Sequence, residues 1–127
     1  KNNCSLWFAE KALGHIQHDL LGSMIIEKWG VSPIIEKVAH WHHTYSKGSR
    51  FLVNDPKIHK LIDIVMLANH MIKELRFGNS GSAEIEELPS AFLRRRRMNE
   101  EEYVSTREAV RMQIDAESEN LAILLNG

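Results

Sequence analysis

The sequence predicts an all-α protein, a compact bundle of five to six helices that forms a single domain over residues 1–127. Apolar residues recur at three- and four-residue steps through most of the chain, which is the period of an amphipathic helix. Serine or aspartate followed by proline twice precedes such a segment, and helices often begin in this way. No segment alternates for long enough to predict a regular strand. With 127 residues and 43% hydrophobic side chains, the chain has the composition of one globular domain.

Two helices are expected before residue 31. The first covers residues 6–13 and is short and apolar, with Gly14 as its end. The second covers residues 18–29, and its apolar residues recur on one face of an amphipathic helix. These residues are Leu21, Met24, Ile25 and Trp29, of which the tryptophan is expected in the core. Gly30 follows directly and suits a left-handed C-terminal cap.

The third helix has a clear start signal. Ser32 can accept a hydrogen bond from an unpaired amide, and Pro33 has no amide to leave unpaired at the first position. The stripe expected to be buried consists of Ile34, Val38, Trp41 and Tyr45. Residues 46–54 are expected to form a loop, in which residues 51–53 are the one candidate for a short extended piece.

The strongest helix signal covers residues 57–77, after Asp55 and Pro56, which repeat the same start signal. Its apolar positions are Ile58, Leu61, Ile62, Val65, Ala68, Ile72 and Leu75. Because the stripe is wide, this helix is expected to be central in the bundle. A turn rich in glycine and serine comes next, over residues 78–82.

The C-terminal part is expected to hold a short helix near residues 90–93 and a long last helix. Asn99 and Glu102 have the spacing of a capping box at the start of the last helix. Between the two helices lie four consecutive arginines, residues 94–97. Four consecutive positions point all around a helix, and the acids at 100–102 offset their charge. We therefore expect a solvated surface or local pairing there, in preference to a site for phosphate or nucleic acid.

Charge and cysteine content exclude several classes of protein. The formal net charge is −1, so no global field favours binding to nucleic acid or to a membrane. The only cysteine, Cys4, cannot form an internal disulfide, which fits a reducing, cytoplasmic compartment.

The chain has no initiator methionine, and we expect it to be the C-terminal part of a longer protein. Near its start, Trp7 lies between Leu6 and Phe8 in an apolar patch that suits self-association.

Histidines are the residues most suited to chemistry, and five of the seven lie within residues 15–43. Neutral imidazole is a common ligand for transition metals. Two pairs at a spacing of three, His15 with His18 and His40 with His43, suggest a four-histidine site between helices. Adjacent His42 and His43 point about 100° apart on a helix, so both reach one ion only at a helix end or bend. Spacing alone still favours ordinary packing or hydrogen bonding for every histidine, most of all for His15, His40, His59 and His70.

The segment HDLLGSMIIEKWGVSPIIEKVAHWHH, together with the C-terminal half of the chain, resembles a known family. Its ordered residues are His18, Gly22, Trp29, Pro33, His42 and His43. Further on come the stretch LAN at residues 67–69, a turn with glycine, the stretch LPSAF and a long final helix. This order is similar to the HDOD family, the HD-related output domains of bacterial signalling proteins. The resemblance covers roughly residues 10–125 and implies an HD-domain-like helical fold.

The resemblance also implies a set of candidate metal ligands. In the related HD-type phosphohydrolases, matching positions hold one or two metal ions, and here these are His18, His42, His43 and the position of Asn69. The family has an aspartate where this chain has Asn69, which removes a negative charge that would hold a hard cation. The dipeptide of His18 and Asp19 occupies the place of the family's later histidine, so we treat it as a coincidental match to the defining His-Asp pair.

The resemblance implies two alternative functions. The first is a non-catalytic bacterial signal-transduction module that binds a protein partner or a small ligand, with no assigned catalytic residue and no required cofactor. Self-association is a further expectation, whereas nucleic acid and membrane are not expected partners. The alternative is a metal-dependent phosphohydrolase or phosphodiesterase of the HD superfamily. In that case His18, His42 and His43 would hold iron, manganese, zinc or nickel.

Overall fold

The computed structural model describes residues 6–78 and 85–126, and over these residues the chain is all-helical. Residues 1–89 and residues 90–127 form two compact units, which are described separately. The expectation of a single domain stays a prediction. The prediction of an all-α protein with five to six helices is confirmed. The described helices are α1 (Leu6–Ala12), α2 (His18–Lys28), α3 (Pro33–Trp41), η1 (Lys47–Ser49), α4 (Pro56–Glu74), α5 (Ser90–Arg95) and α6 (Glu100–Asn126).

The helix starts agree with the capping signals of the sequence. The hydroxyl of Ser32 accepts a hydrogen bond from the backbone N–H of Ile34 at 3.3 Å, and Pro33 is the first residue of α3. The carboxylate of Asp55 accepts one from the backbone N–H of Lys57 at 2.8 Å before α4. Each side-chain oxygen satisfies an amide that the helix itself leaves unpaired.

The glycines predict the ends of α1 and α2 correctly, but not the end of α4. Gly14 and Gly30 have φ of 67° and 66°, the left-handed conformation that lets the chain turn after α1 and α2. The end of α4 was expected at Phe77, but the helix stops at Glu74. Arg76 then takes φ of 53°, so the left-handed turn falls on a residue other than glycine.

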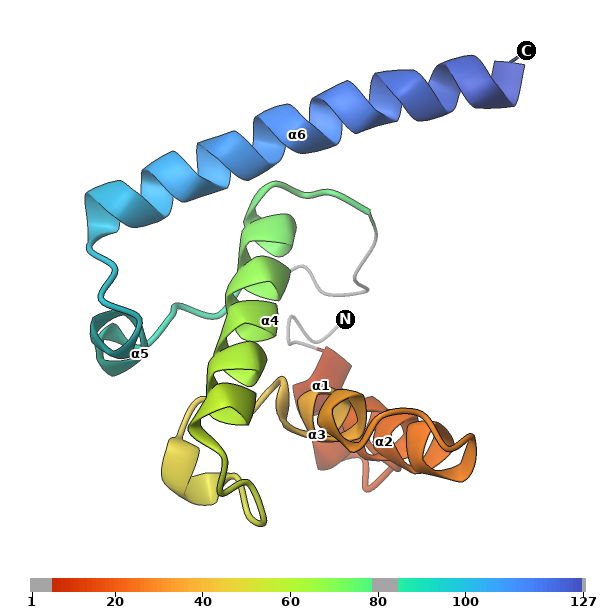
Figure 1. Cartoon of the computed structure of the whole chain (residues 1–127), viewed down its shortest axis with the longest axis vertical. Coiled ribbons are helices and arrows are strands. Elements are labelled where there is room, and N and C mark those ends of the chain that lie inside the picture. The colour runs from red at the N-terminus through yellow and green to blue at the C-terminus, as the bar shows by residue number, and fades with distance from the viewer. Residues whose placement is uncertain (1–5, 79–84, 127) are drawn as a thin grey trace. The chain divides into compact units, whose positions relative to one another are not determined.

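In the first unit, α2 packs along α3, and α3 packs in turn against α4 (Figure 1). Among the described residues of this unit, four apolar side chains are buried, namely Val53, Ile62, Met66 and Met71. Three of them belong to α4, where they spread over about half of the helix circumference, whereas Leu61, Val65 and Ala68 of the predicted apolar stripe are exposed. Asp63 and His70 of α4 are buried as well, so polar groups are part of this core.

The prediction that Trp29 lies in the core is wrong, because its side chain is 76% exposed. The other members of the predicted apolar face of α2, Leu21, Met24 and Ile25, are exposed as well. The buried residues of α2 are instead Asp19 and Ser23, on the other side of the helix. Small and polar side chains allow α2 to approach its neighbours closely there, and a periodic pattern alone cannot indicate this choice.

The stripe predicted for α3 is half-buried instead of buried. Ile34 is 44% exposed, while Val38, Trp41 and Tyr45 are intermediate. The ring of Trp41 lies edge-on to the rings of His40 and Phe51, at centroid distances of 4.3 and 6.1 Å. This tryptophan therefore covers the surface between α3 and the following loop and does not fill a closed core.

The loop after α3 contains a short helical turn and no extended piece. Residues 47–49 form the 3-10 helix η1, and residues 51–52 form a turn in which Leu52 has φ of 65°. The candidate strand at residues 51–53 is therefore absent. Within the part of the chain that the structure describes, no strand is found. Val53, the last residue of that candidate, is buried.

A fully buried ion pair joins this loop to α4. A guanidinium nitrogen of Arg50 lies 2.7 Å from a carboxylate oxygen of Asp63, and both side chains have no exposed surface. Arg50 also donates to the backbone carbonyl of Thr44 at 2.8 Å and to that of His59 at 3.3 Å. One side chain thus holds the chain after α3, the loop and α4 together.

The second unit begins with α5 and continues into α6. Asn99 and Glu102 each accept a hydrogen bond from the other's backbone N–H at 2.8 Å, which confirms the capping box. In the arginine run, Arg94 and Arg97 are exposed, as expected of a solvated surface. The guanidinium of Arg95 lies 5.1 Å from the ring centroid of Phe92.

Among the described residues, no helix has the length and apolar character needed to cross a membrane.

The buried ion pair gives a direct test of the first unit. We expect Asp63→Asn to lower the free energy of unfolding by about 3–5 kcal/mol, because it removes the negative charge opposite a buried guanidinium. Glu108→Gln is the control, since Glu108 pairs with Arg111 at an exposed site and should change stability by about 0–1 kcal/mol. Urea unfolding followed by circular dichroism measures both. Equal unfolding midpoints for the two variants would contradict a structural role for the pair.

Candidate metal centre

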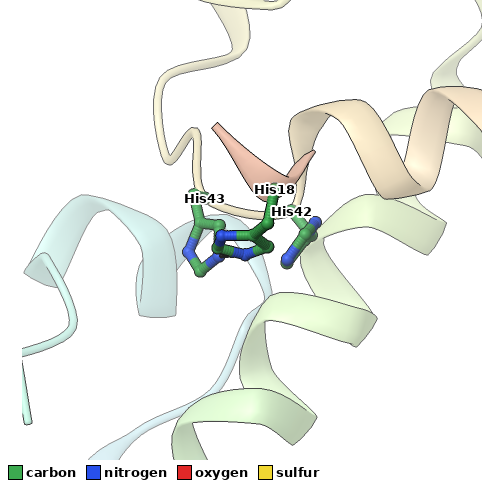
Figure 2. A group of neighbouring side chains, drawn as sticks. All are labelled: His18, His42 and His43. Atoms are coloured by element: carbon green, nitrogen blue, oxygen red, sulfur yellow. Dashed lines mark hydrogen bonds between the residues drawn. The ribbon is translucent and has the colours of Figure 1, made fainter. Parts of the chain in front are cut away.

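Three histidines from different parts of the first unit converge at one point. His18 is the first residue of α2, His42 caps the end of α3, and His43 is the next residue. One ring nitrogen from each can be chosen so that all three lie within 4.8 Å of one another. The Nε2 atoms of His18 and His43 are 2.9 Å apart. Figure 2 shows the three rings grouped closely together. The candidate ligands His18, His42 and His43 are therefore neighbours in the folded chain.

The adjacent pair can face one site because α3 ends there. The helix stops at Trp41, and His42 adopts φ −69° and ψ −2° at the C-cap, with a turn over residues 42–43. The expectation that His42 and His43 share a site only at a helix end is confirmed. The backbone carbonyl of Thr44, one residue further on, accepts the hydrogen bond from buried Arg50. The turn that carries the pair is thereby tied to α4.

Two of the three rings are held by hydrogen bonds on their outer nitrogen. The Nδ1 atom of His18 lies 2.7 Å from the carboxylate of Glu10, and that of His42 lies 2.6 Å from the carbonyl of Ala39. Carboxylates and carbonyls accept, so we assign the proton in each ring to Nδ1. The Nε2 atom of each ring then carries a lone pair, and that of His18 accepts a hydrogen bond from Nε2 of His43, a contact that an ion bound there would replace. This is the usual arrangement of a metal-binding histidine.

The surroundings of His42 and His43 favour the neutral form of both rings. Burial lowers the pKa of His43 from 6.5 to about 4, and the neighbouring His42, His18 and Lys73 contribute to this decrease. Burial likewise lowers the pKa of His42, although its hydrogen bond to Ala39 acts in the opposite direction. Neutral imidazole is the form that binds a metal, so neither ring has to lose a proton at neutral pH before binding an ion.

A polar pocket opens beside the histidines. Its lining residues are Trp7, His42, His43, Tyr45, Met66, Asn69, His70, Lys73, Ile85 and Glu86. Asn69 thus lines the same pocket as His42 and His43, where the resemblance places a metal-binding aspartate. Burial and the charge of Glu86 raise the pKa of the Tyr45 hydroxyl, so this group keeps its proton at neutral pH. The pocket combines one cation, one anion, a neutral amide and a tryptophan ring.

The four-histidine site suggested by the sequence spacing does not form. His15 lies before the start of α2 and is exposed. The Nδ1 atom of His40 is 3.0 Å from the hydroxyl of Ser23, so His40 joins α3 to α2. The Nε2 atom of His70 is 2.7 Å from the carbonyl of Glu86. His40 and His70 therefore serve hydrogen bonding, and His15 stays outside the site.

The sequence interpretation did not place two residues of α1 at this site, namely Trp7, which it assigned to an apolar patch for self-association, and Glu10. The carboxylate of Glu10 accepts hydrogen bonds from both the ring and the backbone N–H of His18. The indole of Trp7 donates to the carboxylate of Asp19 at 3.0 Å. A second oxygen of Asp19 accepts from the backbone N–H of Leu20, so this buried carboxylate is engaged next to the site and is not among the grouped ligands. The turn at Gly14, where φ is 67°, lies between α1 and α2 and allows these side chains to meet.

The donor set suits some ions better than others. Three imidazole nitrogens match zinc, nickel, iron or copper, whereas magnesium and calcium prefer oxygen ligands. Two nitrogens bound to one tetrahedral ion at ordinary bond lengths lie about 3.3 Å apart. His18 and His43 would therefore have to separate by only a few tenths of an ångström from their present 2.9 Å. The three histidines could therefore hold such an ion.

A comparison with protein-family models, curated proteins and solved structures finds no match to this chain. The HDOD resemblance accordingly stays a prediction that depends on the order of residues from His18 to His43. The geometry of the histidines is independent of that resemblance. It shows that His18, His42 and His43 could hold a metal ion.

The lowered pKa of His43 predicts how stability varies with pH. An unfolded histidine takes up a proton near pH 6.5, whereas folded His43 does so only near pH 4. Between these values the unfolded chain binds more protons than the folded chain. The free energy of unfolding should therefore be highest above pH 6.5 and should decrease as the pH drops towards 4. Because the ring is partly exposed, we expect a loss of only about 1–2 kcal/mol.

Urea unfolding in the presence of a metal chelator, at half-unit steps from pH 7.5 to 4.5, measures this loss. His43→Asn has no imidazole to titrate and should show a shallower decline over the same range. Imidazole proton shifts recorded by NMR give the pKa of His43 directly. A folded-state value near 6.5 would contradict the assignment.

Proposed function

We propose that this chain is a non-catalytic signal-transduction module of the HDOD type, bacterial and cytoplasmic, that acts by binding a ligand and a protein partner. The ligand that suits its site best is a divalent transition-metal ion. The observation that carries this proposal is the convergence of His18, His42 and His43. The hydrogen bonds to Glu10 and Ala39 leave Nε2 available on two of these rings.

The state of the carboxylates near the histidines favours metal binding without hydrolysis. A hydrolytic metal centre uses carboxylates to balance the charge of the ion and to orient or deprotonate a water. Asn69 stands at the position of the family's aspartate, and its amide can neither supply a negative charge nor accept a proton. Asp19 is close by, but both of its oxygens accept hydrogen bonds, from Trp7 and Leu20. Glu10 is engaged on the outer side of His18.

A protein partner is part of the proposal because α2 exposes several large apolar side chains. Leu21 is 46% exposed and Met24 is 55% exposed. Apolar surface of this kind is typical of regions that another protein covers. Self-association could bury the same apolar surface of α2 against a second copy of the chain. The formal net charge of −1 gives no support for nucleic acid or a membrane surface as the partner.

One observation favours a second function, a metal-dependent phosphohydrolase. Lys73 and Glu86 line the same pocket as His42 and His43. An ammonium group can bind a phosphate, and a carboxylate can take a proton from water. The pocket therefore has groups suited to a phosphoester beside an ion, and the experiment must separate binding from turnover.

Metal content and turnover, measured on the same preparations, test both functions. We expect the purified chain, loaded with zinc, nickel, iron or manganese and desalted, to retain one ion per chain by elemental analysis. His42→Ala combined with His43→Ala should lose the ion, while His15→Ala, a histidine outside the site, should keep it. We expect no hydrolysis of a generic phosphodiester with added manganese, because Asn69 stands where a hydrolase would have its aspartate.

The possible results separate the two functions. Hydrolysis that disappears in the double variant and persists in His15→Ala would replace the signalling module with the phosphohydrolase. A chain that retains no ion, while circular dichroism shows it to be helical, would overturn the metal-binding part of the proposal.

A further inference from the structure

Helix α1 reaches the rest of the first unit through polar contacts at the histidine site. None of its residues is buried. Its hydrogen bonds to α2 include the one from Trp7 to Asp19 and the two that Glu10 accepts from His18. The ring of Trp7 also lies 5.9 Å from the ring of His43. The groups that dock α1 are thus the same groups that surround the candidate ligands.

Glu10 determines how His18 presents itself to the other two rings. A single carboxylate oxygen accepts the backbone N–H at 3.0 Å and the Nδ1–H at 2.7 Å, which holds both the start of α2 and the plane of the ring. The opposite nitrogen, Nε2, then points at Nε2 of His43. A carboxylate in this position fixes the tautomer of a ligand histidine and makes its free nitrogen a stronger donor to a metal.

We infer that Glu10 is a positioning residue of the histidine site, so that metal binding and the docking of α1 stabilise each other. This inference rests on the proposed metal binding. A cation on Nε2 draws electron density from the ring and makes Nδ1–H a stronger donor to the Glu10 carboxylate. The contact between α1 and α2 is therefore stronger with the ion than without it. By linkage, docked α1 must strengthen metal binding by the same factor.

The docked position of α1 also brings Trp7 to the site. Its indole donates to buried Asp19, and the ring lines the pocket beside His42 and His43. An ion bound at the histidines would hold this indole in place by holding Glu10, three residues along the same helix. Trp7 consequently serves as an optical reporter of the state of α1.

Zinc affinity of the full chain, measured by competition with a chelating dye, tests the role of Glu10. We expect Glu10→Ala to weaken binding about 10–100-fold, the usual effect of removing such an outer partner. Glu10→Gln keeps an acceptor of the same shape without the charge, and its affinity should fall between that of Glu10→Ala and the unaltered chain. Glu27→Gln removes an exposed glutamate of α2 and is the matched control, for which no change is expected.

Tryptophan fluorescence during the same zinc titration tests the coupling to α1. We expect a change that saturates with the metal, disappears in Trp7→Phe and persists in Trp29→Phe. Glu10→Ala should reduce the change even at saturating zinc, because α1 is then no longer held to His18. A residue that only contributed to folding would change the unfolding midpoint but not this optical signal.

The outcomes are distinguishable from those for the proposed function. If the unaltered chain binds zinc and Glu10→Ala binds it within twofold, the inference is overturned while metal binding stands. If Glu10→Ala binds weakly but Trp7 gives no signal in any variant, the coupling to α1 is overturned. If the unaltered chain binds no zinc, both this inference and the proposed metal binding fail.

Discussion

The buried pair between Arg50 and Asp63 is the interaction on which the arrangement of the first unit depends. Two opposite charges without exposed surface are tolerated only when their hydrogen-bonding capacity is satisfied. Arg50 meets this condition by also binding the carbonyls of Thr44 and His59. Those contacts tie the turn after α3 to α4. The two histidines that precede Thr44 are thereby held beside the pocket that Asn69 of α4 also lines.

The histidine site is defined as much by its outer contacts as by its ligands. Glu10 and Ala39 each accept a hydrogen bond from the nitrogen that faces away from the site. Burial lowers the pKa of both His42 and His43, which keeps them neutral. Orientation and protonation state therefore act in the same direction and favour a metal ion over a proton. The proposed ligand function depends on this agreement between geometry and electrostatics.

The proposed function separates binding from hydrolysis at residue 69, where the resemblance implies an aspartate and this chain has an amide. Three neutral imidazole rings leave the charge of a divalent ion uncompensated, and the fourth position can take a water or an anion. In the hydrolases that the resemblance implies, an aspartate supplies negative charge to the ion, whereas the amide of Asn69 cannot. The pocket beside the rings, lined by Lys73, Glu86 and Trp7, is where a further ligand would enter.

The sequence by itself determined the local structure of this protein. Its capping residues set the starts of α3, α4 and α6, and its periodicity identified the helices, because both depend on neighbours within a few residues. The sequence also indicated His18, His42 and His43 as candidate metal ligands. Only the tertiary structure decided which face of α2 is buried, that Trp29 is exposed, and that Glu10 holds His18. These features depend on how separate helices pack. An apolar stripe indicates that one face of a helix can be buried, but it does not identify the helix that packs against it.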